Sequence, residues 1–478
     1  MQFEKEKLIK KSKDFSKWYT DVILKSDLAD YAPVKGCMVI RPYGYAIWEN
    51  IQEVLDRSIK EAGVKNAYFP LFIPEKFLKR EKEHIKGFSP ELAIVTIGGG
   101  KKLRERLVIR PTSETIIYEM FARWIKSWRD LPLKINQWCN IVRWEMRTRP
   151  FLRTTEFLWQ EGHTCHQTHK EALEEVNWAL NNYIKLYQDF FAIDGFLGQK
   201  SESEKFPGAE TTFAFEMLMP DGKALQGATS HDLGQNFAKV FNIKFLDKDG
   251  KKKMPWQTSW GLSTRSIGAL IMSHGDDSGL ILPPQLAPIQ IIIIPIFQGK
   301  SDGQDLVKKV KELKDILKDF RVEADFRKEY SVGWKFNEWE LKGVPLRIEL
   351  GQKEIKENKI TLVRRDNGEE YFIPTNSLKL RTGKILSDIQ KSLFEKSKKY
   401  LKENTKKVFD YKEFKDIIMT EKGFIEAFWC GNPKCEAKIK LETKATTRVL
   451  PPETKTEKGK CVYCGKPAKN KWIFAQAY

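Results

Sequence analysis

Residues 143–163 read RWEMRTRPFLRTTEFLWQEGH, and this stretch decides how the surrounding chain is interpreted. The stretch begins with Arg143 and Glu145 and ends with Glu161 and His163, and three arginines lie between, which indicates two strands joined by an arginine-rich loop. Arginine binds phosphate and carboxylate oxygens through a two-pronged set of N–H donors. Two such strands could seat a nucleoside triphosphate, with the loop at the phosphates. A salt-bridged sheet surface explains any single arginine as well, but a whole set on one sheet favours a site.

The segments around this stretch predict a sheet with one apolar face and one polar face, as expected when one face is core and the other is a site. The clearest strands are 108–110, 133–143 and 157–165. A helix is expected at 170–191, where Thr168 and Glu171 fit a capping box. Another is expected at 46–62, because its apolar residues fall on one face. Residues 1–30 predict a helical N-terminal arm.

Three further segments contain residues that could bind a small anionic ligand. Residues 110–114 read RPTSE, and residues 226–231 read QGATSH, a glycine turn followed by small polar residues. Residues 261–265 read GLSTR and open an apolar helix, which places Arg265 at a helix N-terminus, where anions bind well. A simple turn would explain the second segment equally well. The chain has no Gly-x-x-x-x-Gly-Lys-Ser/Thr loop, so nucleotide chemistry here would not use that cradle.

Length and charge limit the classes of protein to consider. The 478 residues suggest about three domains. The net charge of +19 favours a polyanionic partner, although solubility alone could explain it. The most apolar run, 289–297, is too short to span a membrane, and the N-terminus lacks the apolar core of a signal peptide. Seven cysteines, an odd number, favour a reducing cytoplasm.

The pattern of elements changes at Leu282-Pro283-Pro284-Gln285, which predicts a domain boundary. Strands and helices then alternate, as in a small α/β domain. The expected strands are 289–295, 322–326 and 346–350, the expected helices 305–320 and 331–341, and a hairpin pairs 360–363 with 371–373. The predicted domains are therefore 1–282, 283–390 and 391–478, in an α+β protein.

Four cysteines gather near the C-terminus in two pairs, Cys430-x4-Cys435 and Cys461-x2-Cys464. This spacing, with glycine or proline beside each pair, predicts a closed four-thiolate zinc site whose role is folding. A disulfide pair and a site kept as free thiols are the alternatives. His163, His166 and His169 also suggest a metal, but they straddle a strand-to-helix junction, where their donors should diverge.

Taken together, the segments resemble motifs 1 to 3 of class II aminoacyl-tRNA synthetases. Residues 36–70 resemble motif 1, 143–161 motif 2, and 261–265 with the following helix motif 3. Within the class, PTSE at 111–114, FLWQEGH at 157–163 and TSH at 229–231 resemble the prolyl-tRNA synthetases. The resemblance covers nearly the whole chain. It implies an antiparallel catalytic sheet flanked by helices, an α/β anticodon-binding domain and a small C-terminal zinc-binding module.

The resemblance also implies substrates and roles. ATP and L-proline would form prolyl-adenylate, and the prolyl group would pass to the terminal adenosine of tRNA(Pro), with Mg²⁺ assisting. Arg143 and Arg265 would be catalytic. The implied ATP-binding residues are Arg143, Glu145, Arg153, Gln226, Thr229, Ser263 and Arg265. The implied proline-binding residues are Thr112, Glu114, Trp159, Glu161, His163, Phe206 and His231.

Further expectations concern partners. Arg347 and Glu349 alternate with apolar residues on a predicted strand, and with Lys353 they would read the anticodon, although a solvated face is equally compatible. The resemblance implies a homodimer built through motif 1, without membrane contact. The interval from Glu161 to Gly261 is too short for a large editing insert, as in the archaeal and eukaryotic-like type. The alternatives are another class IIa synthetase and a catalytically inactive RNA-binding paralogue.

Overall fold

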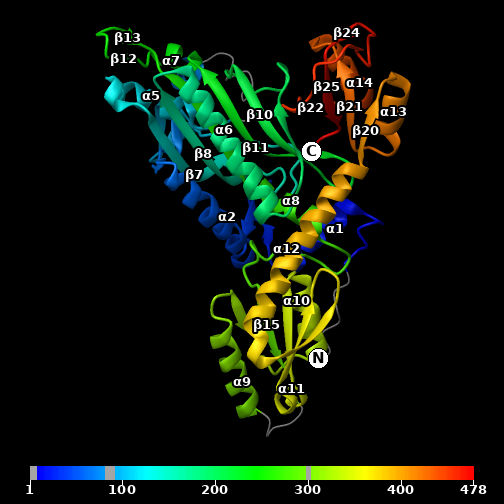
Figure 1. The fold of residues 1–478 in the computed structure, drawn as a ribbon. Helices are drawn as coiled ribbons and strands as arrows, with labels where there is room; N and C mark the ends of the chain where they lie inside the picture. The colour runs from blue at the N-terminus through cyan, green and yellow to red at the C-terminus, as the bar shows by residue number, and fades with distance from the viewer. Residues whose placement is uncertain (1–7, 81–91, 298–302) are drawn as a thin grey trace.

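A computed structural model describes residues 8–80, 92–297 and 303–478, so the first seven residues of the predicted N-terminal arm lie outside it. Its centre is a seven-stranded sheet in the order β3-β7-β8-β14-β11-β10-β9 (Figure 1). All neighbours in this sheet are antiparallel except β3 and β7. The strands are β3 (Lys65–Asn66), β7 (Leu133–Val142), β8 (Glu156–His166), β9 (Phe196–Gln199), β10 (Thr211–Leu218), β11 (Ala224–Gly234) and β14 (Trp256–Ser263).

Helix α6 (His169–Lys185) crosses one face of this sheet and forms the core with it (Figure 1). The predicted capping box is confirmed, because Thr168 and Glu171 bond each other's backbone N–H groups. The helix is shorter than the predicted 170–191, since it turns into a π-helix at Leu186–Phe190. Trp260 packs edge-on against Trp178 of this helix. Its ring lies over Gly162, where a Cβ would come within 2.2 Å of ring carbon, so only glycine fits there.

The N-terminal helices and the motif 3 helix join the same core. Helix α2 begins at Pro42, four residues before the predicted start, because proline is well suited to the first helical turn. These helices are α1 (Phe15–Lys25), α2 (Pro42–Glu61) and α8 (Arg265–His274). A second apolar cluster contains a small three-stranded sheet and several helices, and it packs at the other end of the seven-stranded sheet. Its elements include β4 (Phe72–Pro74), β5 (Ala93–Gly98), β6 (Lys101–Ile109), α3 (Glu75–Arg80), α5 (Glu114–Trp124) and α7 (Asn236–Val240).

The second domain is a five-stranded mixed sheet in the order β16-β15-β17-β18-β19, as the alternating pattern predicts. The predicted hairpin is confirmed by the antiparallel pairing of its two strands. The strands are β15 (Ile291–Pro295), β16 (Val322–Ala324), β17 (Leu346–Leu350), β18 (Lys359–Arg364) and β19 (Glu370–Pro374). The helices are α9 (Gly303–Ile316), α10 (Val332–Leu341) and α11 (Gln352–Glu357), and the first ends before the predicted residue 320.

A long helix, α12 (Leu378–Glu403), connects this domain to the C-terminal one (Figure 1). The division expected between residues 390 and 391 falls inside it. Its apolar residues up to Leu393 pack into the second domain, whereas Leu401 packs against the third. The C-terminal sheet has the order β20-β21-β25-β22. Its elements are β20 (Thr405–Val408), α13 (Tyr411–Thr420), β21 (Phe424–Trp429), α14 (Pro433–Thr443), β22 (Thr446–Val449) and β25 (Asn470–Ala475).

Among the helices that the structure describes, none combines the length and the apolar character needed to cross a membrane.

Candidate active site

A cavity of about 280 Å³ opens on the face of the large sheet opposite α6. Its wall contains every sequence-predicted proline-binding residue and most of the predicted ATP-binding residues. Those found there are Thr112, Glu114, Arg143, Trp159, Glu161, His163, Phe206, Gln226, Thr229, His231, Ser263 and Arg265. Glu145 and Arg153 do not line it. They lie in the loop between β7 and β8, where Arg153 Nε donates to Glu145 Oε2 at 2.6 Å.

Strand register explains why residues far apart in sequence meet here. On the antiparallel strands, His163 of β8 lies opposite Ser259 of β14, which in turn lies opposite His231 of β11. Directly opposed residues point to the same face of a sheet. Two positions along, Glu161, Gly261 and Thr229 repeat the arrangement. The glycine between them leaves room above the sheet.

Glu161 and His163 form a buried ion pair at the floor of the cavity, with His163 Nε2 2.9 Å from Glu161 Oε2. Ser113 and Gln137 also donate to Glu161. Burial by itself would raise the pKa of Glu161, but these hydrogen bonds and the charge of His163 lower it overall. Burial would lower the pKa of His163, but Glu161 outweighs it and raises that pKa. Each member of the pair therefore favours the charged form of the other, a carboxylate beside an imidazolium.

His231 differs from His163 in its charge. Burial, aided by the charge of His163, lowers the pKa of His231 to about 3, so its imidazole is neutral. Its Nδ1 lies 2.9 Å from the Thr212 hydroxyl, and its ring centre is 4.6 Å from that of Phe206. These contacts make an apolar wall with a fixed ring orientation. Opposite charges on the floor and an apolar wall suit a small zwitterion with an aliphatic ring.

Two arginines stand at the other end of the cavity, each oriented by a backbone carbonyl. Arg143 Nε donates to Pro111 O at 3.0 Å, and its guanidinium lies 5.5 Å from the Trp159 ring. Arg265 Nε donates to Leu152 O at 3.1 Å, and this residue begins α8. A helix N-terminus attracts anions. The two side chains thus converge where phosphates could bind.

The sequence predicts a single set of arginines at one site, whereas the structure gives them different roles. Arg110 is fully buried and donates to Phe69 O and Asn140 O, so it ties strands together and does not line the cavity. Conversely, Ser259 and Thr212 line the cavity but were not predicted. The Ser259 hydroxyl is buried without a hydrogen-bond partner among the described residues. The sequence offered one signal for Ser259: it lies two residues before Gly261 on the same strand, so both face the same side of the sheet.

The three predicted anticodon residues lie on the central strand β17 of the second domain and on the helix α11 that follows it. Arg347 and Glu349 are neighbours on β17 and form an ion pair at 2.7 Å, with Arg347 over the Phe336 ring at 4.1 Å. Lys353 is exposed on α11. A second cavity of about 500 Å³ adjoins Arg347, together with Arg364 and Arg365.

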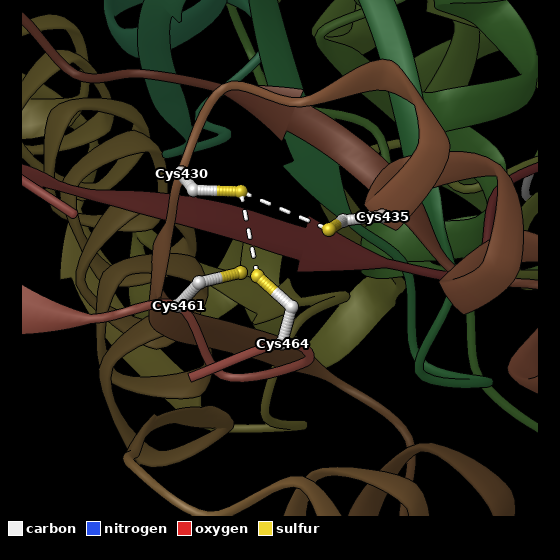
Figure 2. A group of neighbouring side chains, drawn as sticks. All are labelled: Cys430, Cys435, Cys461 and Cys464. Carbon is white, nitrogen blue, oxygen red and sulfur yellow. Dashed lines mark hydrogen bonds between the residues drawn. The ribbon is translucent and has the colours of Figure 1, made fainter. Parts of the chain in front are cut away.

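The four C-terminal cysteines converge, as Figure 2 shows. Cys430 Sγ lies 3.7 Å from Cys435 Sγ and 3.8 Å from Cys464 Sγ, and the four sulfurs all lie within 4.8 Å of one another. All are free thiols. A tetrahedral Zn²⁺ with Zn–S bonds of about 2.3 Å requires sulfurs about 3.8 Å apart. The cluster therefore has the dimensions of a tetrathiolate metal site.

The histidines at 163, 166 and 169 do not converge. His163 binds Glu161, His166 contacts Thr164, and His169 Nε2 lies 2.7 Å from Asp232 Oδ2. His169, Glu210 and Asp232 come within 4.8 Å of one another, away from the other two histidines. The three histidine side chains therefore diverge at the end of β8, as the sequence predicts.

Comparison with known proteins agrees with this geometry. The model for the class II tRNA synthetase core domain (G, H, P, S and T) matches residues 97–274, that for the anticodon-binding domain 290–380, and that for the prolyl-tRNA synthetase C-terminal domain 411–478. Proline–tRNA ligase of Natranaerobius thermophilus is 52% identical over 100% of this chain and 99% of its own. Proline–tRNA ligase 2 of Clostridioides difficile is 52% identical over 99% and 98%.

A solved structure extends the match to three dimensions. It is the crystal structure of prolyl-tRNA synthetase from Cryptosporidium parvum complexed with halofuginone and AMPPNP. Its identity to this chain is 46%, its TM-score 0.94, and it covers 98% of this chain and 99% of its own. The fold is that of a class II aminoacyl-tRNA synthetase. Within that class, the chain belongs to the prolyl-tRNA synthetases, the proline–tRNA ligases.

The buried pair makes a prediction about stability and pH. Because the folded-state pKa of His163 is raised, its proton stabilises the fold fully below about pH 6.5, and this stabilisation is lost as pH rises through the folded-state value. The Tm difference between wild type and His163→Gln should therefore be largest near pH 6 and shrink towards pH 9. Thermal unfolding followed by tryptophan fluorescence measures it.

His274→Gln is the control for that measurement. Burial lowers the pKa of His274 to about 4. Between pH 7.5 and 9 this histidine is therefore neutral in both the folded and the unfolded protein. Its Tm difference from wild type should be constant over that range. A His163→Gln difference that stays equally constant from pH 6 to 9 would contradict the buried charge pair.

Proposed function

We propose that the 280 Å³ cavity is where this chain activates L-proline with ATP and charges tRNA(Pro). The observation that carries the assignment is the meeting of two arginines at one end with the buried Glu161–His163 pair at the other. A proline carboxylate oxygen would attack the α-phosphorus of ATP, and the bond to pyrophosphate would break. A hydroxyl of the terminal tRNA ribose would then attack the prolyl carbonyl, and AMP would leave.

At the nucleotide end, catalysis needs positioning and charge neutralisation more than a covalent nucleophile. Arg143 and Arg265 would bind the phosphates as negative charge moves onto pyrophosphate. Gln226, Thr229 and Ser263 line the same end and would contact the nucleotide. Glu145 and Arg153, paired in the adjoining loop, would reach it when the loop meets ATP. The AMPPNP held by the Cryptosporidium relative supports this assignment.

Mg²⁺ would accompany the nucleotide and neutralise phosphate charge. It prefers oxygen ligands and keeps several waters, so the phosphates themselves supply much of its coordination. The carboxylates in the cavity wall as a whole are Glu114, Glu161 and Glu204. Of these, Glu161 is already bound by His163.

At the other end, the side chains match the three parts of proline. The secondary ammonium would be held by Glu114, whose carboxylate accepts from the Thr112 hydroxyl, and by Glu161. The ring would lie against Trp159, Phe206 and neutral His231. A pocket of this kind selects a small cyclic secondary amine, because the charged groups lie at fixed distances around it.

tRNA would bind through the second domain and the basic excess of the chain. Arg347, Glu349 and Lys353 would contact anticodon bases, since single-stranded bases are read by hydrogen bonds and stacking. The cavity of about 500 Å³ beside Arg347 offers space for a base. A net charge of +19 would add affinity that falls with salt.

The four-cysteine cluster would hold structural zinc. Its sulfur spacing fits a closed tetrahedral site, which leaves no position for a substrate. A bound ion would tie the start of α14 to the segment between β22 and β25 and so stabilise the C-terminal domain. A cytoplasmic location agrees with these free thiols and with tRNA as substrate.

A homodimer is supported by the exposed apolar side chains of the N-terminal region. We call Tyr31, Val39, Tyr68, Phe72 and Ile94 the proposed dimer face; all are exposed. They lie on or beside the small sheets formed by β1 (Ala29–Tyr31) with β2 (Met38–Ile40) and by β4 with β5 and β6. Large exposed apolar side chains on these two small sheets would favour an interaction surface.

ATP–pyrophosphate exchange across a panel of amino acids tests the main proposal. Exchange should be strongest with proline and should fall on the order of 100- to 1,000-fold in Arg143→Ala and Arg265→Ala, because each removes a charge from the phosphate end. Lys399→Ala, at an exposed position on α12, serves as control. Strongest exchange with another amino acid would favour a different class IIa enzyme. Absence of exchange from folded protein with Mg²⁺ would favour the inactive paralogue.

Replacement of one cluster cysteine tests the metal. Cys464→Ser should lose bound zinc and lower the Tm by several degrees, because a three-thiolate site binds more weakly. Elemental analysis by mass spectrometry and thermal unfolding measure the two effects. Cys37→Ser, outside the cluster, should keep one zinc per chain. Equal zinc content in both variants would exclude the proposed site.

Charge placed in the proposed dimer face tests assembly. Val39→Glu and Phe72→Glu should each shift the protein from dimer to monomer, because a buried unpaired carboxylate is costly at an interface. Light scattering after gel filtration measures the mass. Leu441→Glu, an exposed position in the C-terminal domain, should remain dimeric. A wild type that is monomeric at micromolar concentration would refute the dimer.

A further inference from the structure

The C-terminal domain is attached directly to the edge of the catalytic sheet. Gln199 at the end of β9 and Leu450 after β22 exchange two backbone hydrogen bonds, at 2.8 and 3.0 Å. Ala224 at the start of β11 donates to Gln476 O at 2.8 Å. The C-terminus lies beside the catalytic domain in Figure 1. Apolar residues of β10, β22 and β25 share one cluster. The two domains therefore form a continuous structure at this edge.

A β-bulge in the catalytic sheet directs one buried carboxylate towards this junction. Phe215 of β10 pairs with Ala228 of β11, but the next residue, Glu216, pairs with Gln226, so Gly227 is the extra residue. A Cβ on Gly227 would come within 2.7 Å of the Tyr187 ring, which only glycine avoids. The shift places Glu216 and Gln226 on the same face of the sheet as the cavity. Glu216 thus lies beside a proposed nucleotide contact.

The main partner of Glu216 comes from the C-terminal domain. Arg448 Nη2 donates to Glu216 Oε1 and Oε2 at 2.8 and 2.9 Å, and its Nε donates to Oε2 at 3.1 Å. Lys200 Nζ donates to Oε1 alone, at 3.0 Å. The Glu216 side chain is 0% exposed and that of Arg448 is 8% exposed. Among the described residues, therefore, only Arg448 satisfies Glu216 Oε2.

The position of Arg448 depends on an irregularity in its own strand. The register of β22 with β25 shifts between Thr447 and Val449, so Arg448 has no paired residue on β25. Its Nη1 also donates to Thr446 Oγ1 at 3.0 Å, which orients the guanidinium. Bulges commonly re-aim a side chain in this way. Two irregularities, one in each domain, thus bring the carboxylate and the guanidinium together.

Loss of Arg448 would affect the nucleotide end of the cavity. A buried carboxylate oxygen without a donor is costly, so Glu216 would turn towards another cation. Glu216 lies opposite Gln226, and Gln226 lines the cavity together with Arg265, so the Glu216 carboxylate is on the side of the sheet where Arg265 stands. Burial lowers the pKa of Arg265, and the Glu216 carboxylate acts in the opposite direction. Arg265 is the cation proposed to bind ATP phosphates. Competition from Glu216 would weaken that role, and movement of β10 would also displace Gln226.

We infer that Arg448 of the C-terminal domain is a positioning residue for ATP. It holds Glu216 and thereby fixes the β10–β11 pair that carries Gln226, and it keeps Glu216 from binding Arg265. This inference rests on the proposed function of the cavity. It gives the C-terminal domain a part in the first step of the reaction, although that domain contributes no residue to the cavity wall described above.

Steady-state ATP–pyrophosphate exchange on the full-length protein tests this role. Arg448→Met should raise KM for ATP about tenfold and leave KM for proline within about twofold of wild type, because only the nucleotide end is disturbed. Arg448→Lys should give an intermediate KM for ATP, since lysine keeps the charge but not the two-pronged geometry. Glu216→Gln with Arg448→Met should recover most of the ATP affinity, because no buried oxygen then lacks a donor.

Thr447→Val is the matched control within the same domain junction. Its hydroxyl bonds Glu436, a buried carboxylate served by Ser201 and Ser203 of the catalytic domain, and not Glu216. This variant should lower Tm as a loosened junction would, with KM for ATP unchanged. If Thr447→Val raises KM for ATP as much as Arg448→Met does, the effect is general loosening and the inference is wrong.

Other outcomes also decide the matter. An unchanged KM for ATP in Arg448→Met, or equal rises in both KM values, would refute the positioning role while wild-type exchange with proline leaves the proposed function intact. A double variant no better than Arg448→Met would refute the competition with Arg265. Wild type without proline-dependent exchange would overturn the proposed function, and this inference with it. If Arg448→Met fails to fold, Arg448→Lys carries the same comparison.

Discussion

Alternation of side chains along antiparallel strands is the constraint on which the rest of this structure depends. Residues opposite one another on β8, β14 and β11 must point to the same face. One face is therefore committed to Trp260 and the helix α6, and the other to polar groups that would be costly in a core. Gly162 and Gly227 mark where aromatic rings approach the backbone of that sheet. A one-residue slip would exchange core and site.

Burial on the polar face gives the side chains properties that they lack in water. Glu161 and His163 stabilise each other's charged forms, whereas His231, close to them, is neutral. Two histidines separated by a single strand thus differ in charge because one faces a carboxylate and the other a threonine hydroxyl and a phenyl ring. This division separates an ionic floor from an apolar wall in a small volume.

The domains are joined by continuous secondary structure and buried charge. Helix α12 packs its first part into the second domain and its end against the third, so no flexible linker separates them. Two buried carboxylates at the junction, Glu216 of the catalytic sheet and Glu436 of α14, find partners in the opposite domain. Breaking one partner of such a pair is far more destabilising than exchanging both for apolar groups. The C-terminal domain is accordingly an integral part of the fold.

The sequence by itself determined the class of fold, the elements and most of the cavity wall, because motif residues and strand periodicity are local properties of the chain. The capping box at Thr168, the strand 346–350 and the four-cysteine cluster followed from spacing alone. Only the tertiary structure separated buried Arg110 from Arg143 and Arg265, placed Ser259 and Thr212 in the wall, and paired Glu216 with Arg448. Those facts depend on register, on bulges and on contacts between residues more than two hundred positions apart, and no local pattern in the chain encodes which distant side chain a carboxylate will meet.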